Sequence, residues 1–403
     1  MPQLAINGGT PVAAPGVFVN PAWPPVSEAT AESLRELYLS RKWSFNSATE
    51  QEFEQRFAEM HNARYGIFMV NGTVTLECAL AALGVGPGDE VIVPALTWIA
   101  TAMAVRYVGA KPVFADIEPE TFALNPASFE SRITPRTKAV IPVHLYGTMA
   151  DLEAILAIAR RHGLAVVEDC AHAQGAQWNG KGAGSWGDIG SFSFQQSKTL
   201  SSGEGGICIT DDPKLAERLY RAKHIGYSRY DAQGQAGTPP PPGLMCHNYR
   251  SLAFCAQILL DQLPALPRIL AEYRAFADEL QKRTADVEGF RIQQPGRLAT
   301  VQGYYGLGIV FDSPRWNRLP RSRIIAALVA EGVRLNIPYG PVYQHLLFNM
   351  EQGDYRQDGC PVTEHITERT AIIMHYAMGI PGNLPIFDQA IHKLSEHLDE
   401  LQA

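Results

Sequence analysis

Seven short apolar runs, separated by segments with helical spacing, occupy the stretch from residue 65 to residue 210. The runs cover residues 65–70, 90–94, 112–116, 139–143, 164–169, 189–194 and 206–210. Strands that alternate with helices are typical of a mostly parallel sheet that carries helices on its faces. Ligands bind to such sheets beyond the carboxyl ends of the strands. The pattern therefore predicts an α/β fold with about seven strands and a site at that edge.

The chain beyond residue 210 has a different organisation. A helix is expected from Pro213 to about His224, whereas the proline-rich segment 230–243 cannot form regular structure. Two further helices, at 251–263 and 268–284, are separated by Pro264 and Pro267, which break the helical register. Shorter strand and helix patterns follow. We therefore expect a large domain at residues 1–265, including an N-terminal arm, and a smaller α+β domain at residues 266–403.

Composition excludes several classes of partner. The net charge of −7 argues against a polyanion such as nucleic acid. No apolar run approaches the roughly 18 residues that cross a bilayer, and no basic segment precedes an apolar one at the N-terminus, so we expect no membrane association and a cytoplasmic location. The six cysteines are scattered without a Cys-x-x-Cys pair, which predicts reduced thiols and no metal site.

A single lysine, Lys198, lies in the polar turn between the last two apolar runs. A lysine held between strands in a water-poor setting has a lowered pKa and becomes an amine nucleophile. Ser193 precedes it by five residues and is a neutral donor that suits a phosphate. Taken alone, such a lysine is more often an ordinary surface residue.

Three other features point to the same edge of the sheet. Gly72 and Thr73 follow a strand and open a helix, where backbone amides favour an anion, although Asn71 or Thr73 can equally be a simple helix cap. Asp169 ends a strand and is suited to hold a protonated ring nitrogen, or else to form a structural ion pair. Trp98 follows another strand and offers a flat face for a ligand, although a single aromatic is more often part of the core.

An amine for an aldehyde, a carboxylate for a pyridinium, an anion hole and a stacking plane together match pyridoxal 5′-phosphate. The sequence that carries these features resembles the DegT/DnrJ/StrS aminotransferases, the sugar and cyclitol branch of the fold-type I pyridoxal phosphate enzymes. The resemblance extends from Trp43 to about Gly379. It rests on motifs in a fixed order: Asn71-Gly-Thr73, Pro94-Ala-Leu-Thr-Trp98, Pro142-Val-His-Leu-Tyr-Gly147, Glu168-Asp-Cys-Ala-His172, Gly187-Asp-Ile-Gly-Ser-Phe-Ser-Phe194, Ser197-Lys198, Gly203-Glu-Gly-Gly206 and Asn248-Tyr-Arg250.

The resemblance implies a role for each matching residue. Lys198 would bind the cofactor covalently and then move protons, and Asp169 would hold the pyridinium. Trp98 would stack on the ring, with His172 beside it, and Gly72, Thr73 and Ser193 would hold the phosphate. Asn248 would reach that phosphate from the neighbouring subunit of a homodimer, and Arg250 is a candidate for the donor carboxylate. Dehydratases of the family carry histidine in place of the lysine, so Lys198 favours transamination.

The acceptor is the open question. The residues around Lys198, the Trp23-Pro24 arm and His375 are similar to the cyclitol and aminohydroxybenzoate-synthase branch, which implies L-glutamine or L-glutamate as donor, an inosose-like ketone as acceptor and a place in antibiotic biosynthesis. The alternatives are a nucleotide-linked keto-sugar aminotransferase, a dehydratase and a regulatory pyridoxal phosphate protein. Candidates for the acceptor pocket are His224, Tyr227, Arg229, His247, Tyr343, His345 and His375. Only Arg229 among them is a fixed cation, which favours a neutral polyol over a diphosphate.

Overall fold

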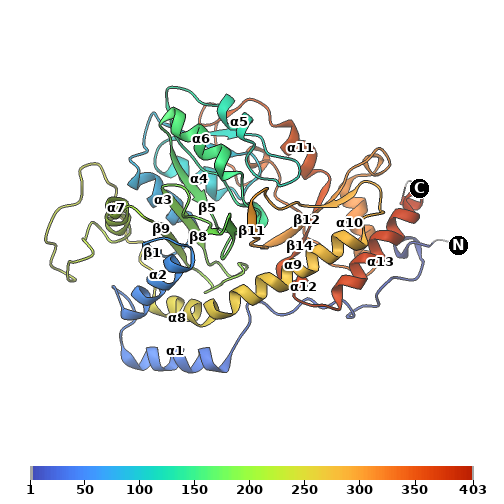
Figure 1. Cartoon of the computed structure of the whole chain (residues 1–403), viewed down its shortest axis with the longest axis horizontal. Coiled ribbons are helices and arrows are strands. Elements are labelled where there is room, and N and C mark those ends of the chain that lie inside the picture. The colour runs from blue at the N-terminus through green and yellow to red at the C-terminus, as the bar shows by residue number, and fades with distance from the viewer. Residues whose placement is uncertain (1–2, 402–403) are drawn as a thin grey trace.

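A computed structural model describes residues 3–401, and its centre is an eight-stranded sheet (Figure 1). In spatial order the strands are β1 (Tyr65–Met69), β9 (Gly206–Thr210), β8 (Ile189–Ser193), β5 (Ala165–Asp169), β4 (Thr137–Val140), β2 (Glu90–Pro94), β3 (Lys111–Ala115) and β13 (Arg356–Gln357). All run parallel except β9, which is antiparallel to both of its neighbours. The predicted α/β class is confirmed. The sheet has the seven predicted strands and an eighth, the two-residue β13, which was not predicted because it contains no apolar run.

The helices that accompany this sheet are α1 (Glu28–Ser40), α2 (Ala48–Met60), α3 (Gly72–Ala82), α4 (Ala100–Tyr107), α5 (Pro126–Ser131), α6 (Leu152–His162) and α7 (Pro213–Lys223). Helices α3 to α6 connect strands of this sheet, whereas α1 and α2 precede β1, α7 follows β9, and α1 packs against the later helix α8 (Ala253–Gln262). Local sequence fixes several of their starts. Ser47 and Glu50 form a reciprocal capping box on α2, and Asp212 caps α7 directly before a proline. Each such cap contributes about 1 kcal/mol to stability.

The C-terminal part of the chain contains a second, antiparallel sheet. Its order is β10 (Phe290–Ile292), β12 (Gly306–Phe311) and β14 (Thr370–Met374). A third small sheet joins β11 (Ala299–Val301) to β6 (Gln177–Trp178) and β7 (Lys181–Gly182). The accompanying helices are α10 (Arg321–Ala330), α11 (Pro361–Thr367), α12 (His375–Met378) and α13 (Asn383–Glu396), with 3-10 turns at Trp316–Arg318, Val342–Gln344 and Leu398–Leu401. Two further 3-10 turns, Ala5–Asn7 and Leu145–Gly147, lie earlier in the chain.

The helix pair around the two prolines is more continuous than the sequence suggests. Helix α8 (Ala253–Gln262) passes through a single 3-10 turn, Leu263–Ala265, into α9 (Leu266–Arg283), and the two follow one line in Figure 1. Pro264 and Pro267 each occupy the first turn of the segment that follows, where a proline needs no amide hydrogen bond. The prolines therefore tighten the join without reversing the chain.

The first residues of the described chain pack against its last ones. The backbone amides of Gln3 and Leu4 donate to the Glu400 carboxylate, and those of Ala5 and Val12 donate to Glu331. Val19 exchanges hydrogen bonds with the side chain of Asn383 in α13. Both ends of the chain accordingly lie at the same end of the molecule in Figure 1. The division into domains at residue 265 stays a prediction.

Segment 230–243, expected to be irregular, contains no helix or strand. Among residues 3–401 no helix combines the length and the apolar character needed to cross a membrane.

Beneath the carboxyl end of β8, an aromatic cluster packs α2 against the sheet. Phe57 lies edge-on to both Phe192 and Phe194, and Phe53 lies edge-on to Phe68. These rings are fully buried and give the strand that leads to Lys198 a rigid base.

Candidate active site

The carboxyl ends of β1, β2, β5 and β8 converge on one cavity of roughly 490 Å³. Each end delivers a predicted residue, because the parallel strands all finish at the same edge of the sheet. The cavity is lined by Asn71, Gly72, Thr73, Leu76, Thr97, Trp98, Ala100, Thr101, Val143, Asp169, Ala171, His172, Ser193, Gln195, Ser197, Lys198, Glu204, Tyr305 and Tyr339. The structure thus brings together seven residues predicted from sequence: Gly72, Thr73, Trp98, Asp169, His172, Ser193 and Lys198.

One end of the cavity is the start of helix α3. The Asn71 side chain caps this helix by accepting from the amides of Thr73 and Val74, at 3.1 and 3.0 Å, so the capping alternative is correct for Asn71. Gly72 touches the end of β8 so closely that an added Cβ would lie 2.5 Å from Cβ of Ser193. A glycine is therefore required here. It keeps the helix N-terminus, the Thr73 side chain and Ser193 beside one another, an arrangement that suits a phosphate.

Asp169 lies at the deep side of the cavity and is 5% exposed. One carboxylate oxygen accepts from the Ala171 amide at 3.1 Å, and the other accepts from Oγ1 of Thr101 at 2.8 Å. Thr97 stands 2.9 Å from Thr101 and extends the hydrogen-bonded chain. Burial raises the pKa of Asp169, and the hydrogen bonds from Thr101 and Ala171 offset this only in part. A cation beside this carboxylate would favour its ionised form.

Lys198 occupies a tight loop after β8 and is 9% exposed. Its amide donates to the Gln195 carbonyl at 2.8 Å, and its own carbonyl accepts from the Trp23 indole at 3.1 Å. Burial lowers the pKa of Lys198 to about 8, and the charge of Asp169 partly opposes that change. A lysine in this state holds an appreciable fraction of neutral amine near physiological pH, as a nucleophile requires.

His172 and Trp98 bound the cavity from different sides. Nδ1 of His172 accepts from the Tyr146 amide at 3.2 Å, which leaves the ring hydrogen on Nε2. Burial keeps the pKa of His172 well below its ordinary value, so the ring is neutral. Trp98 is 43% exposed at the mouth of the cavity, with its ring 5.5 Å from that of Tyr339.

The residues that line this cavity are chemically complementary to pyridoxal phosphate. The close contact at Gly72 places the start of α3 beside Ser193, as a phosphate site requires, and Asp169 is a buried carboxylate available to a ring nitrogen. Lys198 is a buried amine with a lowered pKa in the same cavity. Each chemical group of the cofactor therefore has a complementary partner among the lining residues.

Five residues proposed from sequence do not line this cavity within the chain. Asn248 is exposed and pairs with His224 through a backbone bridge, and the Arg250 guanidinium lies 5.6 Å from the Phe45 ring. His345 is 5.7 Å from the Trp98 ring, and the Tyr343 hydroxyl donates to Glu364. The fifth, His375, is fully buried behind Tyr305 and bonds to its carbonyl oxygen.

The other acceptor candidates also lie outside the lining. His224 is buried against Phe45, His247 stacks on Tyr249, and Tyr227 lies edge-on to Phe45. Arg229 rests over Tyr65, with 5.9 Å between its guanidinium carbon and the ring centroid. Their predicted roles in substrate binding stay predictions.

Seven lining residues with polar side chains received no role from the sequence: Thr97, Thr101, Gln195, Ser197, Glu204, Tyr305 and Tyr339. Thr97 lies in the turn before α4 and Thr101 lies in the first turn of that helix, four residues further on, with 2.9 Å between their hydroxyl oxygens. That spacing, directly after a predicted strand, was a usable signal. No local pattern marks Tyr305 or Tyr339, because more than 100 residues separate each of them from Lys198.

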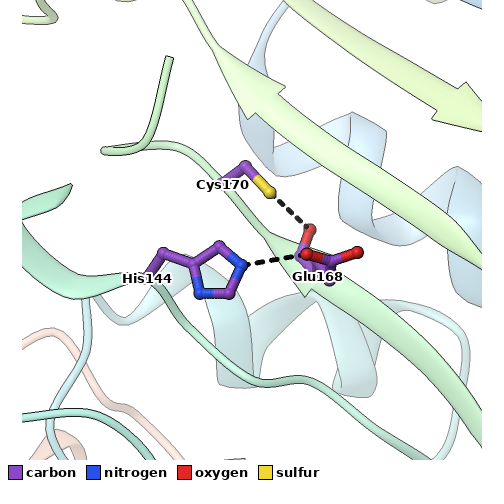
Figure 2. A group of neighbouring side chains, drawn as sticks. All are labelled: His144, Glu168 and Cys170. Carbon is purple, nitrogen blue, oxygen red and sulfur yellow. Dashed lines mark hydrogen bonds and ion pairs between the residues drawn. The ribbon is translucent and has the colours of Figure 1, made fainter. Parts of the chain in front are cut away.

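Glu168, the neighbour of Asp169 in β5, is a buried carboxylate that anchors the end of this strand, and Figure 2 shows it with His144 and Cys170. Glu168 is fully buried and accepts from four N–H groups: the amides of Gly184, Trp186 and Gly187 and Nε2 of His144, at 2.7 to 3.0 Å. Burial alone would raise the pKa of Glu168, but the His144 hydrogen bond and the two glycine amides outweigh it and hold the pKa below its ordinary value. The carboxylate is therefore ionised.

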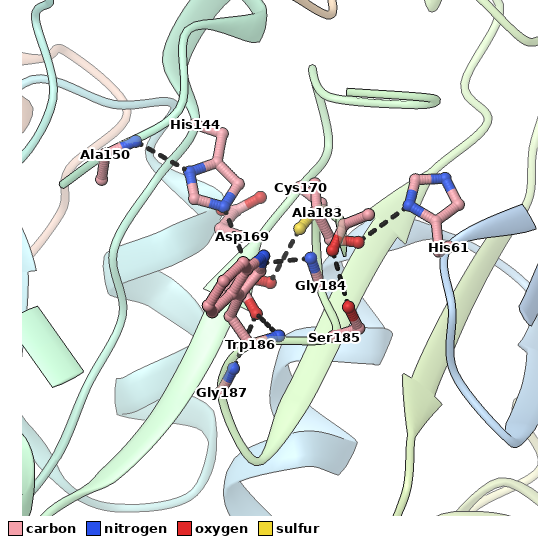
Figure 3. A network of polar contacts seen from close by, with 12 residues as sticks. His61, His144, Ala150, Asp169, Cys170, Ala183, Gly184, Ser185, Trp186 and Gly187 are labelled. Carbon is pink, nitrogen blue, oxygen red and sulfur yellow. Dashed lines mark hydrogen bonds and ion pairs between the residues drawn. The ribbon is translucent and has the colours of Figure 1, made fainter. Parts of the chain in front are cut away.

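The same network fixes the state of His144 and ties three segments together (Figure 3). Nδ1 of His144 accepts from the Ala150 amide at 3.2 Å, so Nε2 carries the hydrogen given to Glu168. Nearby, His61 at the end of α2 bonds to the Ala183 carbonyl at 2.8 Å. Ligand-type atoms of His144, Glu168 and Cys170 lie within 4.8 Å of one another. A metal ion there would have to break these hydrogen bonds, so we interpret the group as a structural anchor.

Comparison with known proteins gives a consistent result. Residues 25–379 match the DegT/DnrJ/EryC1/StrS aminotransferase family. An L-glutamine:2-deoxy-scyllo-inosose aminotransferase from Streptoalloteichus tenebrarius is 35% identical over 100% of this chain and 99% of its own. The crystal structure of 3-amino-5-hydroxybenzoic acid synthase matches with a TM-score of 0.85 at 27% identity, covering 95% of this chain and 99% of that one.

A second solved structure has a similar degree of likeness. DesI, crystallised in the presence of its TDP-sugar product, matches with a TM-score of 0.83 at 27% identity, over 99% of this chain and 98% of its own. The family match covers most of the sequence, and the cavity supplies a partner for each group of the cofactor. The chain belongs to the DegT/DnrJ/EryC1/StrS aminotransferase family and is a pyridoxal-phosphate-dependent aminotransferase.

Proposed function

We propose that this enzyme transfers an amino group from L-glutamine, or from L-glutamate, to the ketone of an inosose-like cyclitol. The observation that carries the proposal is the 35% identity, over the full length of both chains, with an enzyme named L-glutamine:2-deoxy-scyllo-inosose aminotransferase. Such a reaction belongs to aminocyclitol biosynthesis, and we infer that the product serves an antibiotic pathway.

When bound, pyridoxal phosphate supplies the electron sink that allows the donor to lose a proton from Cα. We assign the movement of that proton to Nζ of Lys198, which takes it from the donor and, in the second half of the reaction, delivers a proton to the acceptor carbon. The lowered pKa of about 8 supports this role, because general bases work best when their pKa is near the operating pH.

The remaining lining residues are assigned to holding the cofactor. Asp169 would keep the ring nitrogen protonated, with Thr101 and Ala171 fixing its carboxylate in place. The start of α3, together with Thr73 and Ser193, would hold the phosphate. The Trp98 ring would cover the cofactor at the cavity mouth, and Nε2 of His172 would donate to a cofactor oxygen.

The charge of the cavity supports a neutral acceptor. Among the described residues that line it, Lys198 is the only lysine, there is no arginine, and Asp169 and Glu204 are acidic. A nucleotide-linked sugar would bring a diphosphate, whose burial requires arginines, lysines or a second helix N-terminus. A keto-cyclitol needs only hydroxyl-binding side chains.

The acceptor preference can be measured in one half-reaction. We expect the pyridoxamine form of the enzyme to return to the pyridoxal form at least about 10²-fold faster with an inosose-type ketone than with a nucleotide-linked 4-keto-hexose. The inosose is neutral, whereas the diphosphate of the nucleotide sugar would be buried without cationic partners. Stopped-flow absorbance of the cofactor reports the rate, with glutamine used to prepare the amino form. Rapid return with the nucleotide sugar alone would overturn the cyclitol assignment.

A second candidate is an aminotransferase for a nucleotide-linked keto-sugar, which is favoured by the likeness to DesI and its TDP-sugar product. The same half-reaction separates it from the first. A dehydratase or a non-catalytic regulator is disfavoured by the intact Lys198. If added glutamine converted no bound cofactor to its amino form, those two classes would return.

We also propose that the enzyme is a homodimer in which Asn248 contacts the cofactor phosphate of the partner's site. Asn248 is exposed and outside the cavity of its own chain. Its segment is nevertheless held firmly, because the amides of His247 and Tyr249 donate to the end of α7, at 2.7 and 2.9 Å, and the Val70 amide donates to the Tyr249 carbonyl. A rigid, outward-facing segment is suited to completing a site on another copy.

Subunit mixing tests this sharing. After exchange between Lys198→Ala and Asn248→Ala chains, each inactive by itself, we expect mixed dimers to regain one working site of two. Mixing Lys198→Ala with Asp169→Ala is the matched control. Both residues of that pair belong to one chain's site, so no activity should return. Failure of the first pair to recover after verified exchange would contradict sharing through Asn248.

A cytoplasmic location is part of the proposal. All six cysteines are free thiols in the structure, and four of them are buried, as expected for a protein of a reducing compartment.

A further inference from the structure

Tyr305 forms the wall of the cavity nearest to Lys198 and reaches it from a strained turn. Tyr304, directly before it, has a φ of 45°, a left-handed conformation that a bulky residue seldom adopts. Gly303 is pressed against the loop after β5, where an added Cβ would lie 2.8 Å from the His172 carbonyl oxygen. The turn is held in this conformation by that contact, and it aims the Tyr305 side chain at the lysine.

The ring face of Tyr305 receives the lysine amine directly. Nζ of Lys198 lies 4.4 Å from the ring centroid, well within the distance at which a cation is attracted by an aromatic face. Tyr305 is buried, so water weakens this attraction little. The contact acts on the protonated amine alone, because a neutral amine carries no charge for the ring to attract.

The ring is fixed from several sides. Its hydroxyl is 2.9 Å from Oγ of Ser197, the residue next to the lysine, and its opposite neighbour is the His172 ring, stacked at 3.9 Å. Nδ1–H of His375 donates to the Tyr305 carbonyl at 2.9 Å. The Trp23 ring packs edge-on to His375 at 4.6 Å, and its indole N–H donates to the Lys198 carbonyl. Trp23 therefore links the backbone of Lys198, through a hydrogen bond, to that of Tyr305, through His375.

We propose that Tyr305 is a positioning residue for Lys198, and that its ring face holds the Lys198 ammonium whenever that amine is protonated and not bonded to the cofactor. A protonated lysine released during turnover is thereby kept within reach of the cavity instead of turning away from it. This role does not depend on which ketone is the acceptor.

The groups around Lys198 define the sign of the effect. Burial lowers the pKa of Lys198 to about 8, and the Asp169 carboxylate opposes that change. His172 and His375 are neutral because burial lowers both of their pKa values, and Glu204 and Tyr339 complete the titratable lining. An aromatic face favours the charged amine, so removing it should lower the lysine pKa further.

The test measures the lysine itself in the holoenzyme. In the pyridoxamine form Lys198 is not bonded to the cofactor, so a brief pulse of acetic anhydride at a series of pH values, followed by mass spectrometry of the Lys198 peptide, gives its pKa. Tyr305→Met, which fills much of the volume without a ring, should lower that pKa by about 0.5 to 1 unit. Tyr305→Phe, which keeps the ring, and Tyr339→Phe, in the same cavity, should leave it nearly unchanged.

Each result decides the proposal. An unchanged or raised pKa in Tyr305→Met would overturn it, as would an equal fall in Tyr339→Phe. Thermal unfolding of each variant checks the fold. If the methionine variant were unstable, Tyr305→Leu would serve with the same expected fall. Steady-state kinetics add a second readout: Tyr305→Met should lower kcat more than it changes KM, and the pH optimum of kcat should move down with the lysine pKa.

Discussion

Lys198→Ala is expected to lower kcat by more than about 10⁴-fold, because it removes both the amine that attaches the cofactor and the group that moves the proton. The variant should also lose the covalent link that borohydride fixes in the wild-type protein, which mass spectrometry of the Lys198 peptide detects. Because only the neutral amine is a nucleophile and the pKa of Lys198 is about 8, attachment of added cofactor to the wild-type apoenzyme should speed up as pH rises through that value.

Two control variants separate chemistry from charge. Lys198→Arg keeps a cation in the loop but cannot supply a neutral amine, so it should be as inactive as the alanine variant. Lys181→Ala removes a lysine outside the cavity, whose amine bonds to the Ser185 carbonyl, and should keep the borohydride-fixed link. Full activity in Lys198→Ala would contradict the assignment of the whole site.

Asp169→Ala is expected to cost about 10³-fold or more in kcat while leaving the link at Lys198 intact. The carboxylate is the buried negative charge that would keep the ring nitrogen protonated, and without it the electron sink is lost. Rapid mixing of the variant with glutamine should show slow conversion of bound cofactor to its amino form. Cofactor content, measured separately by borohydride reduction, should stay near the wild-type value.

Asp169→Asn is the conservative comparison, since the amide keeps the volume and can accept from Thr101 but carries no charge. We expect it to be nearly as slow as the alanine variant. If Asp169→Asn retained wild-type kcat, charge at this position would be unimportant and the pyridinium role would be wrong.

The sequence predicted those parts of the site that lie at the end of a strand or shortly after it. Asp169 and Ser193 end strands and Gly72 and Trp98 follow shortly after strands, and the parallel arrangement of those strands predicts where their ends meet. Thr101 lies in the first turn of α4, shortly after the end of β2. Its contact with Asp169 was missed because a threonine in a helix has many uses other than bonding to a carboxylate.

Other parts could not be read from local pattern. Glu168 sits in a strand that is buried on both faces, where periodicity does not distinguish a solvent-facing side chain from one that collects four N–H donors. Tyr305 reaches Lys198 through the left-handed turn at Tyr304, and no sequence rule predicts a tyrosine in that conformation. Whether Asn248, Arg250, Tyr343, His345 and His375 contact a substrate depends on a bound ligand and a second copy, so those assignments stay predictions.

The packing of the first residues against the last helices has a consequence for how the protein is made. The partner of Val19 in α13 follows it by 364 residues, and Glu400 follows Gln3 by 397. At a synthesis rate of about 5–20 residues per second, the first segment waits roughly 20 to 80 s on the ribosome before its partners exist. Trp23 continues that segment and holds the Lys198 carbonyl. We therefore expect the lysine loop, although translated halfway through, to gain its contact with Trp23 only after the last helices have been made.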